Sequence, residues 1–125
     1  MAAASEKHLL IVEDSPDLQH LLGQLLRKEG YTLSTALNGQ EALNLLRTMS
    51  TPPNAILLDI MMPVMDGITF RDEQRKDPRL ADIPVVVMTA DSHPESKAAR
   101  LQVQDFIRKP VDVPQLLAII ERVCG

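Results

Sequence analysis

The sequence has few aromatic residues, one cysteine and no long apolar run, and each shortage excludes a class of protein. The only aromatic residues are Tyr31, Phe70 and Phe106, so the core must be built from aliphatic side chains. Cys124 has no second cysteine to pair with, which excludes an intrachain disulfide and fits a reducing, cytoplasmic location. No stretch approaches the ~18–20 apolar residues that span a bilayer. The first seven residues contain no apolar stretch, so we expect no signal peptide there and a soluble protein.

Positive charge is also in short supply. Lys and Arg number 13 against 17 Asp and Glu, and the formal net charge is −4. Non-specific nucleic-acid binding needs a basic surface, so we expect no direct nucleic-acid partner. The length of 125 residues suits one domain. We therefore predict a single domain over residues 1–125, with a core at about 7–124.

Short apolar runs alternate with segments of helical periodicity along the whole chain. This alternation predicts an α/β fold in which a parallel five-stranded sheet is covered by helices on both faces. The predicted strands are 8–12, 31–36, 55–58, 83–88 and 104–108. The predicted helices run from Pro16 to before Gly30, from Asn38-Gly39 to Met49, and over roughly 68–75, 95–101 and 113–123.

Two of these elements carry unusual polar residues. The second strand alternates polar and apolar residues, which indicates a sheet edge and the strand order 2-1-3-4-5. We expect it to contribute nothing to a functional site. The third helix has a poor apolar stripe, because Arg71 and Gln74 lie where Ile68 predicts apolar neighbours. Before the first helix, either Asp14 or Ser15 is the expected cap.

Polar residues follow four of the five predicted strands, at the point where each strand ends. Glu13 and Asp14 follow the first strand, Asp59 the third, Thr89 the fourth and Lys109 the fifth. The carboxyl ends of parallel strands emerge along one edge of the sheet, beside the topological switch point. We therefore expect these side chains to converge in one crevice.

The residue types in this crevice predict phosphoryl chemistry with a divalent cation. Three carboxylates would repel one another and raise one another's pKa unless a cation lay between them. Oxygen ligands without nearby His or Cys favour Mg²⁺, and His8, His20 and His93 are scattered. Asp59 can attack phosphorus to form an acyl phosphate, while Lys109 and the metal neutralise charge.

Each of these residues alone also has a structural explanation, as a helix cap, a turn residue or an exposed lysine. The joint pattern is much harder to obtain by accident. It completes a resemblance, over essentially the whole chain, to the receiver domain of two-component response regulators. The matching segments are Leu10-Ile11-Val12-Glu13-Asp14, Ile56 to Gly67, Val86-Val87-Met88-Thr89-Ala90 and Phe106-Ile107-Arg108-Lys109-Pro110.

The resemblance implies a flavodoxin-like sheet and a phosphoryl switch. Asp59 would accept the group from the phosphohistidine of a sensor histidine kinase or phosphotransfer protein, and Thr89 and Lys109 would contact it. The implied Mg²⁺ ligands are Glu13, Asp14, Asp59 and the backbone carbonyl of Met61. Lys109–Pro110 would be a cis peptide and Phe106 the switch aromatic. The surface formed by the fourth helix, fifth strand and fifth helix would regulate a downstream protein.

Several residues depart from the family pattern near that output surface. The stretch from Thr89 to Lys109 is short, Gln102-Val103 replaces a small Gly-Ala pair, and Val111 replaces a common Phe. Two alternatives stay open: a phosphorylation-independent receiver-like interaction module, and a flavodoxin-like nucleotide or flavin protein. We expect a stand-alone receiver, a monomer or weak dimer, that catalyses only its own phosphorylation and dephosphorylation and is not otherwise an enzyme.

Overall fold

A computed structural model describes residues 7–60, 67–90, 99, 101, 103 and 105–124. Its strands are β1 (His8–Val12), β2 (Thr32–Ala36), β3 (Ala55–Asp59), β4 (Val85–Thr89) and β5 (Asp105–Arg108). They form one parallel sheet in the order β2-β1-β3-β4-β5, which confirms the predicted order and fold class.

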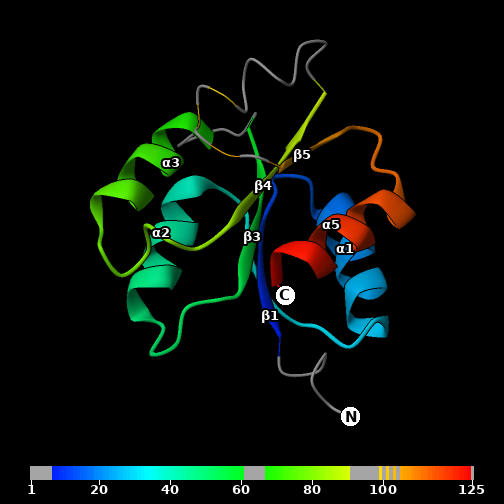
Figure 1. Cartoon of the computed structure of the whole chain (residues 1–125), viewed down its shortest axis with the longest axis horizontal. Helices are drawn as coiled ribbons and strands as arrows, with labels where there is room; N and C mark the ends of the chain where they lie inside the picture. The colour runs from blue at the N-terminus through cyan, green and yellow to red at the C-terminus, as the bar shows by residue number, and fades with distance from the viewer. Residues whose placement is uncertain are drawn as a thin grey trace.

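Four helices are described: α1 (Pro16–Lys28), α2 (Gly39–Thr48), α3 (Gly67–Lys76) and α5 (Val113–Cys124). Figure 1 shows α2 and α3 on one face of the sheet and α1 and α5 on the other. The helix expected around 95–101 lies outside the described residues except for Ala99 and Leu101. None of the described helices has the length and apolar character needed to cross a bilayer.

Strand alternation divides the core into two layers. Successive residues of a strand point to opposite faces, so every residue of a strand covered on both sides must be apolar. In β1, Leu10 and Val12 pack on the α2–α3 side, whereas Leu9 and Ile11 pack on the α1–α5 side. The continuous apolar runs that predicted β1, β3 and β4 follow from this double coverage.

The starts of two strands differ from the sequence prediction, because a backbone N–H near each start donates to a carbonyl outside the sheet. The helix α1 ends at Lys28, Gly30 follows with a φ of 99°, and the N–H of Tyr31 donates to the Leu26 carbonyl. β2 therefore begins at Thr32 and not at Tyr31. Likewise β4 begins at Val85 and not at Ile83, because the Ile83 N–H donates to the Leu80 carbonyl and Pro84 has no N–H.

The N-termini of α1 and α2, which follow β1 and β2, are capped by side chains. Ser15 is the cap of α1, since its hydroxyl accepts the Leu18 N–H at 3.3 Å. Asn38 caps α2 by accepting the Glu41 N–H at 2.8 Å. Asp14, the other cap candidate, does not cap the helix, so its carboxylate remains available where the carboxyl ends of the strands meet.

Candidate functional site

Strand alternation directs three charged side chains to the same side of the carboxyl edge. Glu13 continues the row of Leu9 and Ile11, Asp59 continues that of Leu57, and Lys109 that of Ile107. These apolar residues all belong to the α1–α5 layer. The same periodicity that buries the core therefore brings Glu13, Asp59 and Lys109 together at the strand tips.

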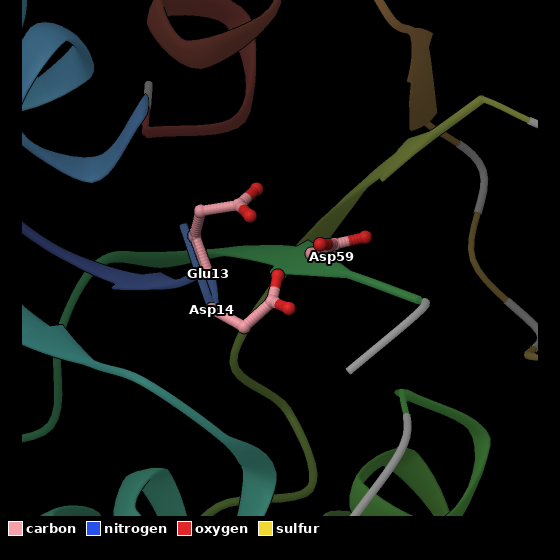
Figure 2. A group of neighbouring side chains, drawn as sticks. All are labelled: Glu13, Asp14 and Asp59. Carbon is pink, nitrogen blue, oxygen red and sulfur yellow. The ribbon is translucent and has the colours of Figure 1, made fainter. Parts of the chain in front are cut away.

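The three predicted acids form one cluster. Glu13, Asp14 and Asp59 each offer a carboxylate oxygen, and these oxygens all lie within 4.8 Å of one another. Figure 2 shows Glu13 and Asp14 at the tip of β1 and Asp59 on the neighbouring β3. Glu13 and Asp59 are buried, whereas Asp14 is exposed. Three of the five side chains predicted to converge therefore lie together.

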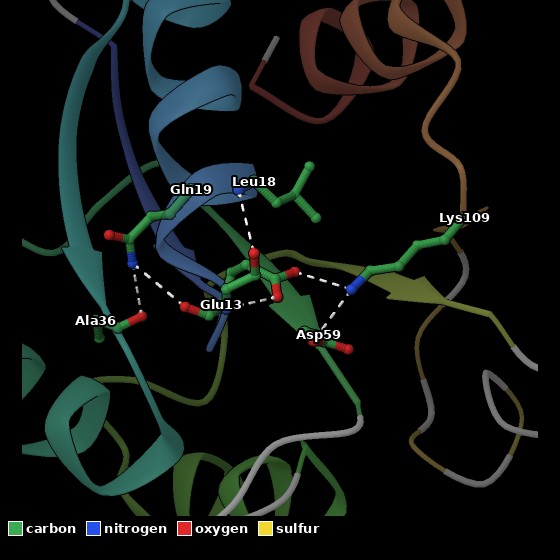
Figure 3. A network of polar contacts seen from close by, with 7 residues as sticks. Glu13, Leu18, Gln19, Ala36, Asp59 and Lys109 are labelled. Atoms are coloured by element: carbon green, nitrogen blue, oxygen red, sulfur yellow. Dashed lines mark hydrogen bonds and ion pairs between the residues drawn. The ribbon is translucent and has the colours of Figure 1, made fainter.

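Lys109 binds two of the acids at once. Its Nζ donates to Glu13 Oε1 at 3.0 Å and to Asp59 Oδ2 at 3.2 Å, as Figure 3 shows. The Glu13 side chain is 1% exposed and that of Asp59 4%, so both acceptors are shielded from water, whereas the Lys109 side chain is 25% exposed. The amine neutralises part of the cluster's negative charge at the place where a ligand would meet Asp59.

Burial and neighbouring charges shift the pKa values of this pair. Desolvation, helped by the Asp59 charge, raises the pKa of Glu13 to about 7, although hydrogen bonds from Lys109 and the Ser15 N–H favour its charged form. Burial alone would lower the pKa of Lys109, but the two carboxylates outweigh it and the pKa is raised. The two carboxylates therefore favour the charged form of the Lys109 amine.

The oxygens present fit a small, hard divalent ion. Mg²⁺ takes oxygen ligands at about 2.1 Å in an octahedron, which places neighbouring ligand oxygens about 3 Å and opposite ones about 4.2 Å apart. The carboxylate oxygens of the cluster lie within 4.8 Å of one another, a limit close to the larger of these two spacings. The cluster holds carboxylates only, and no His or Cys joins it among the described residues. The backbone carbonyl of Met61, the fourth implied ligand, lies outside the described residues.

Thr89 and Phe106 lie on the other face of the sheet near the same edge. Thr89 is 1% exposed and ends β4, in the row of Val85 and Val87. Phe106 pairs with Val87 across β4 and β5 and packs, half-buried, on the α2–α3 layer. Strand alternation thus puts both expected switch residues in one layer, which runs to the strand tip.

The chain turns away from the edge at Lys109. The Lys109 N–H donates to the Thr89 carbonyl at 2.7 Å, which extends the β4–β5 pairing by one residue. The Lys109–Pro110 peptide, expected to be cis from the resemblance, is cis. The pairing with β4 fixes where the Lys109 side chain leaves the backbone.

Two groups behind the acids, the Gln19 amide and the Ala36 carbonyl, were not predicted from the sequence. Gln19 of α1 donates from Nε2 to the backbone carbonyls of Glu13 and Ala36. Ala36 ends β2, so the backbone of the edge strand, which we expected to contribute nothing, holds the turn behind the acids. A signal was present, since Gln19 precedes Leu22 and Leu26 by three and seven residues, on the buried side of α1.

Comparisons with known proteins agree with this geometry. A family model described as the response regulator receiver domain matches residues 9–121. An uncharacterised 14.6 kDa protein of Leptolyngbya boryana is 32% identical over 99% of this chain and 95% of its own length. The chain spans about half the length of several curated transcriptional regulators that it matches.

Two solved structures share the fold closely. The signal receiver domain of a histidine kinase from Syntrophus aciditrophicus is 32% identical, with a TM-score of 0.85 over 94% of this chain and 89% of its own. The receiver domain of sensor histidine kinase PA1611 from Pseudomonas aeruginosa is 28% identical, with a TM-score of 0.84 over 95% of this chain and 98% of its own. That structure holds a magnesium ion coordinated in its active site cleft.

Proposed function

This chain belongs to the response regulator receiver domain family, and we propose that it is a phosphoacceptor switch of a two-component system. In the proposed reaction, a carboxylate oxygen of Asp59 attacks the phosphorus of a phosphohistidine. The P–N bond breaks, its electron pair stays with the histidine nitrogen, and the phosphoryl group remains on Asp59. The observation that carries this proposal is the three-acid cluster with the amine of Lys109 on two of its members.

We propose Mg²⁺ as the ion of this cluster, held by Glu13, Asp14 and Asp59 and, by the resemblance, by the carbonyl of Met61. The spacing and chemistry of the described oxygens support this assignment, as does the magnesium ion in the PA1611 receiver domain. When bound, the ion would neutralise charge on the oxygens of the transferring phosphoryl group. Lys109, which donates to Asp59 Oδ2, would supply the second positive charge.

The same proposal accounts for a switch. An aspartyl phosphate would carry a charge of about −1.5 to −2 on its phosphoryl oxygens, by analogy with other phosphorylated side chains, in place of the single charge of the Asp59 carboxylate. The Thr89 hydroxyl would donate to a phosphoryl oxygen and draw the end of β4 toward it. Because Phe106 packs in the same layer as Val87, it would repack with that movement. The surface around β5 and α5 would then change its affinity for a protein target.

We further propose the partners and setting of the reaction. The phosphoryl donor would be a sensor histidine kinase or a phosphotransfer protein, and the protein would catalyse only its own phosphorylation and dephosphorylation. The lone Cys124 supports a reducing compartment such as the cytoplasm.

The decisive experiment is phosphorylation with a small-molecule donor. We expect the chain to gain the mass of one phosphoryl group when incubated with acetyl phosphate and Mg²⁺, and to gain none when EDTA replaces the metal. Asp59→Asn abolishes the gain, because the amide cannot form the acyl phosphate. Asp17→Asn is the matched control, since Asp17 is an exposed acid in the first turn of α1. Intact-protein mass spectrometry measures all four reactions.

A different pattern would replace the proposal by one of its alternatives. No mass gain in the unchanged chain would favour a receiver-like module that binds partners without phosphorylation. A gain that survives in Asp59→Asn would place the phosphoryl group elsewhere and refute the assigned acceptor.

A further inference from the structure

Gln19 joins the turn that carries two of the acids to the edge strand of the sheet. Its Nε2 donates to the Ala36 carbonyl at 3.0 Å and, in a longer contact, to the Glu13 carbonyl at 3.4 Å. The Ala36 carbonyl also accepts the backbone N–H of Glu13 at 3.1 Å. Figure 3 shows the Gln19 amide between the two backbones. Both peptide groups of Glu13 are thus tied to the end of β2.

This tie matters most for Asp14. The Glu13 carbonyl belongs to the peptide group that joins Glu13 to Asp14, so its orientation sets where the next side chain leaves the backbone. The carboxylates of Glu13 and Asp59 are both held by Lys109. The Asp14 carboxylate is exposed and has no hydrogen-bond partner among the residues that the structure describes. Its place in the cluster therefore depends on the backbone.

We propose that Gln19 is a positioning residue that orients the Glu13–Asp14 peptide and so raises the affinity of the acidic cluster for Mg²⁺. The inference rests on the proposed function for the identity of the ion. Groups behind the ligands that fix their orientation commonly change metal affinity by about 10–100-fold. A purely packing role is a poor explanation for this residue, because its neighbours on the buried side of α1, Leu22 and Leu26, are apolar.

The test removes the two donated hydrogen bonds and keeps the length of the side chain. Gln19→Met does this, because methionine is unbranched and has no N–H. Gln24→Met is the matched control on the exposed face of the same helix. We expect the Kd for Mg²⁺, measured by isothermal titration calorimetry on the full chain, to rise about tenfold in Gln19→Met. In Gln24→Met it should stay unchanged.

A second readout separates positioning from general damage. The rate of phosphorylation by acetyl phosphate is measured as a function of Mg²⁺ concentration. We expect Gln19→Met to need more Mg²⁺ for its half-maximal rate and to approach the unchanged chain's rate at saturation. An unaltered half-maximal Mg²⁺ concentration, or a rate deficit that saturating Mg²⁺ does not recover, would overturn the proposed role.

The outcomes also distinguish this inference from the function on which it rests. If the unchanged chain binds Mg²⁺ and Gln19→Met binds it equally well, the positioning role fails and the phosphoacceptor proposal stands. If the unchanged chain binds no Mg²⁺, both fail together.

Discussion

Gly67 is the residue at which backbone crowding comes closest to the proposed phosphoacceptor. A Cβ added at this position would lie 2.8 Å from Ile60 Cα and 3.2 Å from the Asp59 carbonyl oxygen. The Gly67 N–H also donates to the Ile60 carbonyl at 2.9 Å. The start of α3 therefore packs directly on the backbone that leaves β3, and it can do so because position 67 has no side chain.

The first prediction compares two glycines in helices. We expect Gly67→Ala to lower the free energy of unfolding by about 1–3 kcal/mol, because only backbone atoms can yield to the new methyl group. Gly23→Ala should instead raise it by up to about 1 kcal/mol, since its Cβ would meet chiefly the flexible end of Arg27 at 3.3 Å. Urea titrations of both variants measure the difference, and equal effects would refute the argument.

Single residues also mark the limit of what the sequence predicts about the site. The charged residues of the site were predictable, because they directly follow apolar strands whose carboxyl ends lie along one edge of a parallel sheet. They are Glu13, Asp14, Asp59 and Lys109. Gln19 was not predictable, because its partners are backbone carbonyls and these carry no signature in the sequence. The sequence shows a polar residue on the buried side of α1, but it does not show the backbone carbonyls to which that residue donates.

At the scale of elements, α3 is held by polar contacts where an apolar stripe was missing. Gln74 is fully buried, and its Nε2 donates to the carbonyls of Leu80 at 2.8 Å and Ile83 at 3.1 Å. Arg71 donates to Gln74 Oε1 at 2.8 Å and to the Leu101 carbonyl at 2.9 Å. Burial lowers the pKa of Arg71, with a smaller contribution from Arg75. These contacts join α3 to the segment that leads into β4 and to the region before β5.

The second prediction concerns this buried amide. We expect Gln74→Leu to lower the free energy of unfolding by about 1–3 kcal/mol, because it removes the donor shared by two buried carbonyls. Gln115→Leu, at an exposed position of α5, should change it by no more than about 0.5 kcal/mol. Thermal and urea unfolding of both variants provide the comparison. Stability unchanged in Gln74→Leu would mean that water or the loop satisfies those carbonyls.

The elements themselves were predictable because both sheet faces are covered. Double coverage forces whole apolar runs on β1, β3 and β4, and such runs stand out in a sequence. Their ends were less predictable, since the start of β2 depends on one N–H bond from Tyr31 back to α1. The polar character of α3 was visible in Arg71 and Gln74, but the loop that they hold was not.

At the scale of the whole molecule, the acids tie folding to metal binding. Glu13 and Asp59 come from neighbouring strands and meet only when the sheet is formed. An ion that binds the folded cluster and not the unfolded chain must therefore stabilise the fold.

The third prediction follows from this coupling. We expect Mg²⁺ at ten times its Kd to raise the free energy of unfolding by about 1.4 kcal/mol. KCl at equal ionic strength should give no comparable gain, and neither should Mg²⁺ added to Asp14→Asn. Thermal unfolding at several Mg²⁺ concentrations measures the effect. A shift of equal size in Asp14→Asn would place the ion outside this cluster.

The alternation of side chains between the two faces of the sheet also limits which insertions and deletions the sequence can accept, in engineering or in evolution. Inserting or deleting one residue within β1 or β3 would turn Glu13 or Asp59 toward the α2–α3 layer and an apolar neighbour toward the crevice. Insertions or deletions within these two strands should therefore abolish phosphorylation. Such changes should be tolerated at the opposite edge, where the connection at 49–54 joins α2 to β3 far from the acids. A library of single-codon insertions and deletions, sorted by phosphoryl uptake, tests this: uptake should be lost for changes within β1 and β3 and kept for changes at 49–54.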